Sequence, residues 1–311
     1  MDEELLSSLA LASVFEIGAR RFALLFGEFG SARRAYNAPK SELRRVLGHT
    51  HDSLVEHIVD SRKRRSVTLR IERLLADVRA VQIEPVWLGS QDYPRLLRYI
   101  PDPPPVLWVR GLLKPEAERV AVVGTRQASA YGRKVARLIG AQLARSGYEV
   151  VSGLALGIDC EAHEAVTSHG GMALAVLGTA VDALKGYKER LAQKIVSAGG
   201  AVVTEYTPGT VVQKYHFVAR NRIISGLSSG VVVVEAPARS GALITAGFAL
   251  EQGREVMAVP GSVLSTANDG GHALLRDGAA LVRCGDDVMA VLGQSRYTRC
   301  SRVRMQSDNG V

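Results

Sequence analysis

The 311-residue chain contains only three cysteines, Cys160, Cys284 and Cys300, and no CxxC pair. An odd number of widely separated cysteines argues against a disulfide framework and against a thiolate metal site. The chain also lacks a run of about 18 uncharged apolar residues, so no transmembrane helix is expected. Its acidic start, Met1-Asp2-Glu3-Glu4, is unlike a secretory signal. These absences favour a protein of the reducing cytoplasm with no membrane partner.

The common catalytic and nucleotide-binding motifs are missing as well. The sequence has no HExxH and no paired acidic cluster. It also lacks GxGxxG and GxxxxGK[ST], the glycine-rich loops of dinucleotide and nucleoside triphosphate sites. We therefore expect a protein that is not an enzyme and holds neither a metal nor an organic cofactor.

What the chain does have is an excess of positive charge. The formal net charge is +8 and the isoelectric point is about 9.6, which favours a polyanionic partner. The excess is spread along the chain, apart from a short basic tail at 294–311. Composition alone therefore permits nucleic-acid binding without establishing it.

Hydrophobic patterning divides the chain into parts. Residues 4–80 show helical spacing, and residues 81–119 are rich in proline, with short extended pieces at 86–88 and 106–109. After that, helical stretches alternate with apolar runs at Val120–Val123, Glu149–Ser152, Ala173–Leu177, Ala201–Thr204, Gly230–Val234, Glu255–Val259 and Ala280–Val282. Continuous apolar runs at this spacing are typical of parallel strands covered on both faces. The pattern predicts a small helical domain (1–85), an α/β domain with a doubly wound, mostly parallel, Rossmann-like sheet (86–293) and the tail (294–311).

Ligands of such sheets bind beyond the carboxyl ends of the strands, so the loops after each run are the candidate site. The first loop contains Gly124, Arg126 and Ser129 at the expected start of a helix near Gly132. Free N–H groups and the helix dipole there favour a phosphate, which Arg126 can bind with two hydrogen bonds. The alternative is that Gly124 forms a tight turn and Arg126 pairs with a carboxylate.

The second loop contains Gly153, where the backbone can approach a ligand closely. It is followed by Asp159, which we expect to cap the next helix. His163 lies four residues after Asp159, on the same helix face. A metal pair is the less favoured interpretation, because no further ligand cluster is near in the sequence, and a structural pair is preferred.

The loop after the fourth run is followed by cations and aromatic residues at close spacing. Lys214 and Arg220 are candidates for phosphate contacts, and Phe217, Tyr215 or His216 for stacking on a base. Asn221 is expected to fix an irregular loop or to bind a base edge. Alternatively, Phe217 belongs to the core and Arg222 to a buried ion pair.

The loop after the fifth run begins with one carboxylate, Glu235. We expect Glu235 to accept hydrogen bonds from Arg222 or from backbone N–H groups, because no second acid is near for general acid–base chemistry.

Several of these stretches together resemble one known family, the DprA/Smf DNA-processing proteins of bacteria. The matching segments are VAVVGTRQASAYG (120–132), VVSGLALGIDCEAH (150–163), TEYTPGT (204–210), HFVARNRIISGLS (216–228), VVVEAPARSGALITAGFALEQGREVMAVPG (232–261) and LLRDGA (274–279). The resemblance implies an extended Rossmann-like fold that binds single-stranded DNA, interacts with RecA and loads it in natural transformation, and forms a homodimer. By motif position it implies DNA contacts first at Arg126, Lys214 and Phe217, and then at Gly124, Ser129, Gly153, Arg220 and Asn221.

Two other interpretations remain open at this point. One is a phosphoribohydrolase of the lysine-decarboxylase-like (LOG) type, which has an arginine and a glycine–threonine loop around a nucleotide. Its distinguishing glutamate, in a PGGxGTxxE motif, has no counterpart in the stretch 239–247. The other is a degenerate scaffold that binds only protein.

Overall fold

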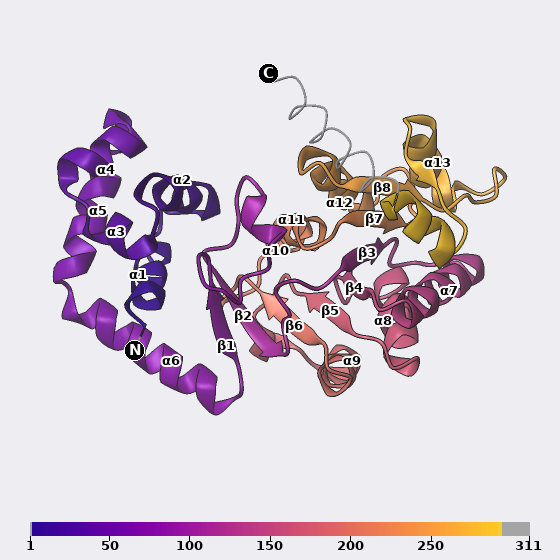
Figure 1. Ribbon diagram of the computed structural model, residues 1–311, viewed down its shortest axis with the longest axis horizontal. Coiled ribbons are helices and arrows are strands. Elements are labelled where there is room, and N and C mark those ends of the chain that lie inside the picture. The colour runs from indigo at the N-terminus through magenta and orange to yellow at the C-terminus, as the bar shows by residue number, and fades with distance from the viewer. Residues whose placement is uncertain (1, 294–311) are drawn as a thin grey trace, which may run out of the picture.

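The computed structural model describes residues 2–293, and the predicted basic tail at 294–311 lies outside the described residues. The chain begins with six helices and continues into a nine-stranded sheet with further helices (Figure 1). The strands are β1 (Glu84–Trp87), β2 (Val106–Gly111), β3 (Arg119–Val123), β4 (Glu149–Ser152), β5 (Ala173–Val176), β6 (Ala201–Thr204), β7 (Gly230–Val233), β8 (Glu255–Ala258) and β9 (Ala280–Leu281).

The helices divide into an N-terminal group and a group that belongs to the sheet. The first are α1 (Glu3–Ala12), α2 (Ala19–Phe29), α3 (Ala32–Asn37), α4 (Lys40–Leu47), α5 (Asp52–Lys63) and α6 (Arg65–Ala80). The second are α7 (Ala130–Arg145), α8 (Ile158–Ser168), α9 (Gly186–Ser197), α10 (Lys214–Ala219), α11 (Asn221–Gly226), α12 (Gly241–Glu251) and α13 (Asp269–Arg276). Residues 285–293 are also helical.

The strand order is β1-β2-β6-β5-β4-β3-β7-β8-β9. β1 and β2 pair antiparallel, as do β2 and β6, and all other neighbours are parallel. The prediction of a doubly wound, mostly parallel α/β sheet preceded by helices is confirmed. The seven apolar runs form β3 to β9, and the two extended pieces of the proline-rich segment form the antiparallel end of the sheet.

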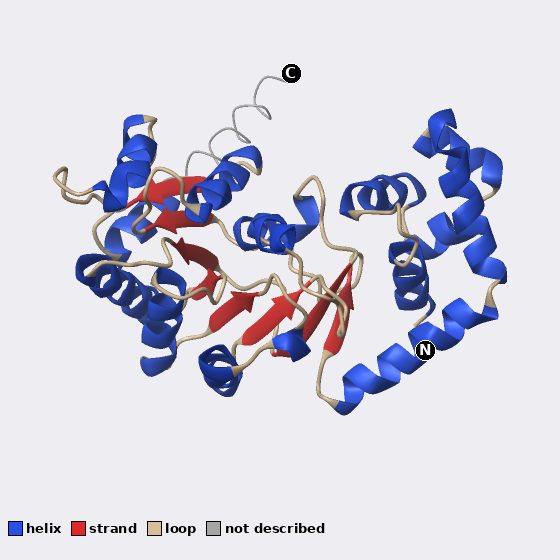
Figure 2. Ribbon diagram, turned by 180° about the vertical axis from the view of Figure 1, so that it is seen from behind, coloured by secondary structure: helices blue, strands red, loops and turns tan. Residues whose placement is uncertain are grey.

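Alternate residues of each central strand enter two separate cores, one on each face of the sheet. In β3, Ala121 and Val123 belong to the core that includes residues of α11 and α12, whereas Val120 and Val122 belong to the core that includes residues of α7, α8 and α9. Since both faces are covered, both sets of side chains are apolar, which is why the runs do not alternate with polar residues. Figure 2 shows helices on both sides of the strands.

The N-terminal helices pack against the antiparallel end of the sheet. Leu9 of α1 and Leu75 of α6 share a buried cluster with Trp108 of β2. The phenyl ring of Phe26 lies so close to Gly89 that a Cβ at Gly89 would come within 2.8 Å of it. The helices end at Ala80 and the sheet begins at Glu84, so the domain boundary predicted after residue 85 falls inside β1. No helix among residues 2–293 is long and apolar enough to cross a membrane.

Candidate nucleic-acid interface

The strand order reverses between β3 and β7. From β3 the chain continues to β4 on one side, whereas β7 lies on the other side and continues to β8. The loops that leave these two strands therefore diverge, and a crevice opens between them beyond the carboxyl ends. A cavity of about 360 Å³ occupies this place.

Four charged side chains line this cavity, which we call the switch-point cavity. Arg126 comes from the loop after β3, Asp159 from the first turn of α8, Arg220 from the junction of α10 and α11, and Arg239 from the loop after β7. Three cations face one carboxylate, so the lining is net positive. A phosphate is the ligand chemistry that such a lining favours.

Arg126 is the exposed cation on the β3 side of the cavity. Among the described residues it forms no ion pair, so the alternative in which Arg126 pairs with a carboxylate is not observed. Its guanidinium lies 5.9 Å from the ring centroid of Phe217, within the range of a cation–π contact. Phe217 is half-buried and packs against Gly178, where a Cβ would come within 2.8 Å of the ring. A cation and an aromatic face are thus presented together, the pair that a phosphate and an adjoining base require.

The start of α7 is not free to bind a phosphate as the sequence led us to expect. The Ser129 N–H donates to Glu235 Oε2 at 2.8 Å, and the Ser129 hydroxyl accepts from Gly132 N at 3.0 Å. Glu235 is 4% exposed, so its carboxylate already satisfies the positive end of this helix. The expectation that Glu235 accepts a hydrogen bond from a backbone N–H is confirmed. The alternative expectation, that Arg222 donates to Glu235, is wrong, because Arg222 donates to Asp102 and Glu205.

Arg220 and Asp159 form the buried floor of the cavity. Arg220 is 5% exposed and donates from Nη1 to the Val176 carbonyl at 2.6 Å. Burial lowers the pKa of Arg220 to about 10, so the side chain remains charged at neutral pH. Asp159 Oδ2 accepts from Gly153 N at 3.0 Å, and burial raises the pKa of Asp159. Asp159 does not cap α8 as predicted, because Gly157 is the N-cap residue and Asp159 lies within the first turn.

His163 lies deeper on α8 and is completely buried. Burial lowers its pKa to about 4, so the imidazole is neutral at pH 7. Within residues 2–293 no group of three His, Cys, Asp or Glu side chains is placed to hold a metal ion.

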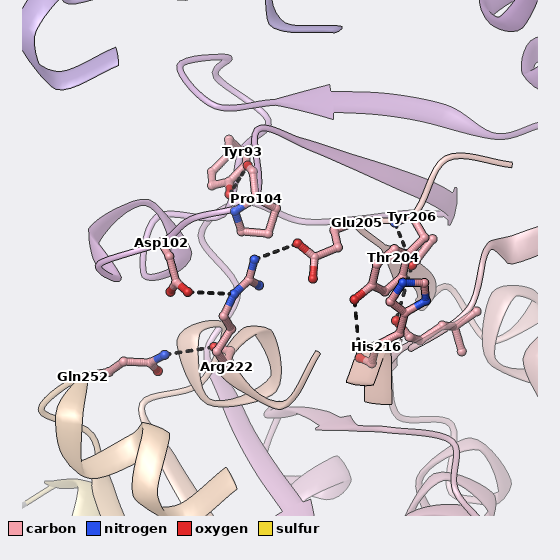
Figure 3. A network of polar contacts seen from close by, with 10 residues as sticks. Tyr93, Asp102, Pro104, Thr204, Glu205, Tyr206, His216, Arg222 and Gln252 are labelled. Carbon is pink, nitrogen blue, oxygen red and sulfur yellow. Dashed lines mark hydrogen bonds and ion pairs between the residues drawn. The ribbon is translucent and has the colours of Figure 1, made fainter. Parts of the chain in front are cut away.

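Arg222 holds the segments behind the cavity together. Its Nε donates to Asp102 at 3.1 Å and its Nη2 to Glu205 at 2.6 Å (Figure 3). The side chain is 7% exposed, which confirms the interpretation of Arg222 as a buried ion-pair residue. The network ties the proline-rich segment to the end of β6 and to α11.

The helix that carries Phe217 is fixed by the neighbouring His216. Its Nδ1 accepts from the Gln213 N–H at 3.2 Å and so caps the first turn of α10. The imidazole also stacks on the Tyr206 ring, with centroids 3.9 Å apart (Figure 3). This pairing orients α10 so that Phe217 lines the cavity while Lys214, at the exposed start of the helix, does not.

The structure brings together five of the eight residues that the sequence singled out: Gly124, Arg126, Phe217, Arg220 and Asn221 all line the switch-point cavity. Ser129 lines a neighbouring cavity beside Glu235, and Lys214 lies outside. Gly153 lies behind the floor, where a Cβ would come within 1.8 Å of Arg220 Nη1. Gly153 therefore makes room for Arg220, which is a structural requirement of the floor.

Arg239 lines the cavity and was not selected from the sequence. It is exposed and forms no ion pair among the described residues. The signal was present, since Arg239 follows the fifth apolar run just before Ser240, the side-chain cap of α12. What the sequence could not show is that the loops after β3 and β7 diverge around one cavity.

The fold and this cavity define a Rossmann-like protein with a cationic crevice at its topological switch point. The chain belongs to the family described as DNA recombination-mediator protein A, whose model matches residues 84–293. This confirms the resemblance found from the motifs.

Individual relatives agree with this assignment. The chain is 45% identical to DNA processing protein DprA of Streptococcus pneumoniae over 202 residues, covering 64% of this chain and 70% of the relative. It is 35% identical to Protein Smf of Synechocystis over 290 residues, covering 92% and 72%. The X-ray structure of the S. pneumoniae DprA superposes with a TM-score of 0.77 at 31% identity, covering 93% of this chain and 98% of that one.

A second solved structure concerns the single-stranded DNA binding mode of DNA processing protein A from Helicobacter pylori. It superposes with a TM-score of 0.60 at 25% identity and covers 68% of this chain and 97% of that one.

Proposed function

We propose that this protein binds single-stranded DNA in the switch-point cavity, as a recombination mediator without catalytic activity of its own. The observation that carries the proposal is the Arg126 guanidinium, which forms no ion pair within residues 2–293 and lies beside the Phe217 ring in a net cationic cavity. Arg126 supplies a phosphate contact and Phe217 a face on which a base stacks. Both interactions are independent of base identity, so binding is sequence-tolerant.

Single strands are favoured over duplex for a geometric reason. A base reaches Phe217 only when it is unstacked, and unstacking a base from a duplex costs a few kcal/mol. A single strand avoids most of this cost. The relative from Helicobacter pylori, which is described by its single-stranded DNA binding mode, supports the same ligand.

The finer parts of the proposal follow from the family resemblance. The protein loads RecA on incoming DNA during natural transformation, in the cytoplasm and as a homodimer. A dimer presents two cavities to one strand, and this raises the effective affinity if the strand spans both. RecA loading is measured by the ATP hydrolysis of RecA on single-stranded DNA that is already covered by a single-strand-binding protein. Hydrolysis should begin sooner when this protein is present than when it is absent.

The first experiment is fluorescence anisotropy of a labelled single-stranded oligonucleotide at two salt concentrations, with duplex of the same sequence as competitor. Binding should fall with salt and resist the duplex. Arg126→Gln should weaken binding, whereas Arg145→Gln, which removes an exposed charge at the far end of α7, should have little effect.

Absence of binding by the unmodified protein would overturn the proposal. Nucleoside monophosphates would then be titrated in place of the oligonucleotide. Binding and hydrolysis of a monophosphate would favour a nucleotide enzyme of the LOG type, and binding of neither would favour a scaffold for protein partners.

A further inference from the structure

The strands β3 and β7, which meet at the switch point, are followed by α7 and α12, and of these two helices α12 is the one whose start is open to an anion. The start of α7 receives the Glu235 carboxylate through the Ser129 N–H at 2.8 Å. The start of α12 has no acidic residue in its first turn, and its cap, the Ser240 hydroxyl, accepts from Ala242 N at 3.3 Å. Within residues 2–293 the Gly241 N–H, which precedes Ala242, has no hydrogen-bond partner.

The residues around the start of α12 favour an anion independently of the helix. Arg239 and Gly241 line the same cavity as Arg126, so two exposed guanidiniums approach it from different loops. Neither guanidinium forms an ion pair or a hydrogen bond in the part of the chain that the structure describes. Two like charges at one cavity repel each other, and a phosphate between them would relieve that repulsion.

A buried cation in the floor points to the same ligand. The Arg220 side chain lines the cavity and is only 5% exposed. Its Nε has no hydrogen-bond partner within residues 2–293. The one acidic residue of the lining, Asp159, accepts from Gly153 N. Because Asp159 carries at most one negative charge and three arginines line the cavity, the cavity has a net positive charge.

We propose that the N-terminus of α12 is a phosphate subsite, in which Arg239 and the Gly241 N–H bind one phosphodiester of the DNA and Arg126 contacts it from the β3 side. The inference rests on the proposed single-stranded DNA binding. It makes Arg239 a DNA-contact residue and places the phosphate at α12, because Glu235 already occupies the start of α7.

The Gly241 N–H can be removed without disturbing the helix. Gly241 is the first residue of α12, a position that tolerates proline because its N–H is not part of the helix. The preceding Ser240 is extended, with φ −94° and ψ 141°, as a residue before proline must be. A Cβ at Gly241 would meet nothing within 4 Å. Gly241→Pro therefore deletes one donor, and Gly241→Ala is the matched control that keeps it.

The charge is tested with a second pair of variants. Arg239→Gln removes the proposed contact, and Arg133→Gln removes an exposed charge of α7 that does not line the cavity. Single-stranded oligo(dT) binding is measured by anisotropy over a series of salt concentrations. We expect Arg239→Gln to weaken binding about tenfold, the usual loss for a hydrogen-bonded charged pair. The slope of log K against log salt should fall by about 0.7, which corresponds to one phosphate of a single strand.

Gly241→Pro should weaken binding severalfold relative to Gly241→Ala, and Arg133→Gln should remain close to the unmodified protein. If Arg239→Gln and Gly241→Pro both match their controls while Arg126→Gln still loses affinity, the subsite at α12 is excluded and DNA binding stands. If the unmodified protein does not bind oligo(dT), the proposed function itself fails. Circular dichroism confirms that each variant is folded.

Discussion

Gly153 lies directly against the buried guanidinium of Arg220: a Cβ built at Gly153 would come within 1.8 Å of Nη1 and 2.5 Å of Cζ. Arg220 cannot move aside freely, because the same Nη1 donates to the Val176 carbonyl at 2.6 Å. The floor of the switch-point cavity therefore depends on the absence of a side chain at the end of β4.

Gly153→Ala should destabilise the fold by about 1–3 kcal/mol, the usual cost of forcing extra volume into a packed interior. Urea denaturation measures this as a lower midpoint. Gly247→Ala on α12 is the control, since a Cβ there meets nothing within 4 Å and alanine favours a helix. Equal midpoints for both variants would show that Arg220 relaxes without cost.

Lys214 and Arg126 should contribute unequally to DNA binding. Arg126 lines the cavity, whereas Lys214 is exposed at the start of α10 and does not. Arg126→Gln should cost about 1–3 kcal/mol of binding free energy, as for a contact to a charged group, and Lys214→Gln less than 1 kcal/mol. Anisotropy titrations of the two variants at one salt concentration give the comparison. A larger loss for Lys214→Gln would mean that the strand runs along α10 outside the cavity.

Phe217→Leu should separate stacking from packing. Leucine retains apolar contact with Gly178 and loses the aromatic face that Arg126 approaches at 5.9 Å. We expect a loss of about 1–3 kcal/mol in DNA affinity, the range found for a base stacked on an aromatic ring. The thermal midpoint should change little, because a half-buried leucine replaces most of the lost contact. A variant with a lower midpoint and unchanged affinity would assign Phe217 to the core alone.

Acid should destabilise the protein through His163. Its pKa is about 4 in the fold and 6.5 without burial, so below pH 6.5 the unfolded chain binds a proton that the folded chain does not. Stability is therefore unaffected by this group at pH 7 and falls as the pH approaches 4. A shift of this size corresponds to a loss of about 2 kcal/mol between pH 7 and pH 5.

The contribution of His163 is isolated by comparing urea denaturation of the protein and of His163→Leu at pH 7 and pH 5. Leucine has a similar volume and does not titrate, so the variant should lose less stability at pH 5 than the unmodified protein. If the two lose the same amount, other groups carry the acid sensitivity.

The order of elements follows from the sequence alone. Apolar runs such as Val120–Val123 and Gly230–Val234 are too continuous for a strand with one solvated face, so a parallel sheet covered on both sides was predictable. The loops after these strands were predictable as the site for the same reason, because parallel strands place their carboxyl ends at one edge. Arg126 and Phe217 were found in this way.

Only the tertiary structure decided which groups at that edge are free. Ser129 and Arg239 both lie beside the start of a helix, and the sequence favoured Ser129 as a contact. The chain brings Glu235, 106 residues further on, to the Ser129 N–H and leaves Arg239 without an ion pair among the described residues. Local sequence determines where helices and strands begin and end, since backbone hydrogen bonding and side-chain periodicity act over a few residues. Whether a charge is paired depends on partners that are distant in the sequence, and only the folded sheet brings these together.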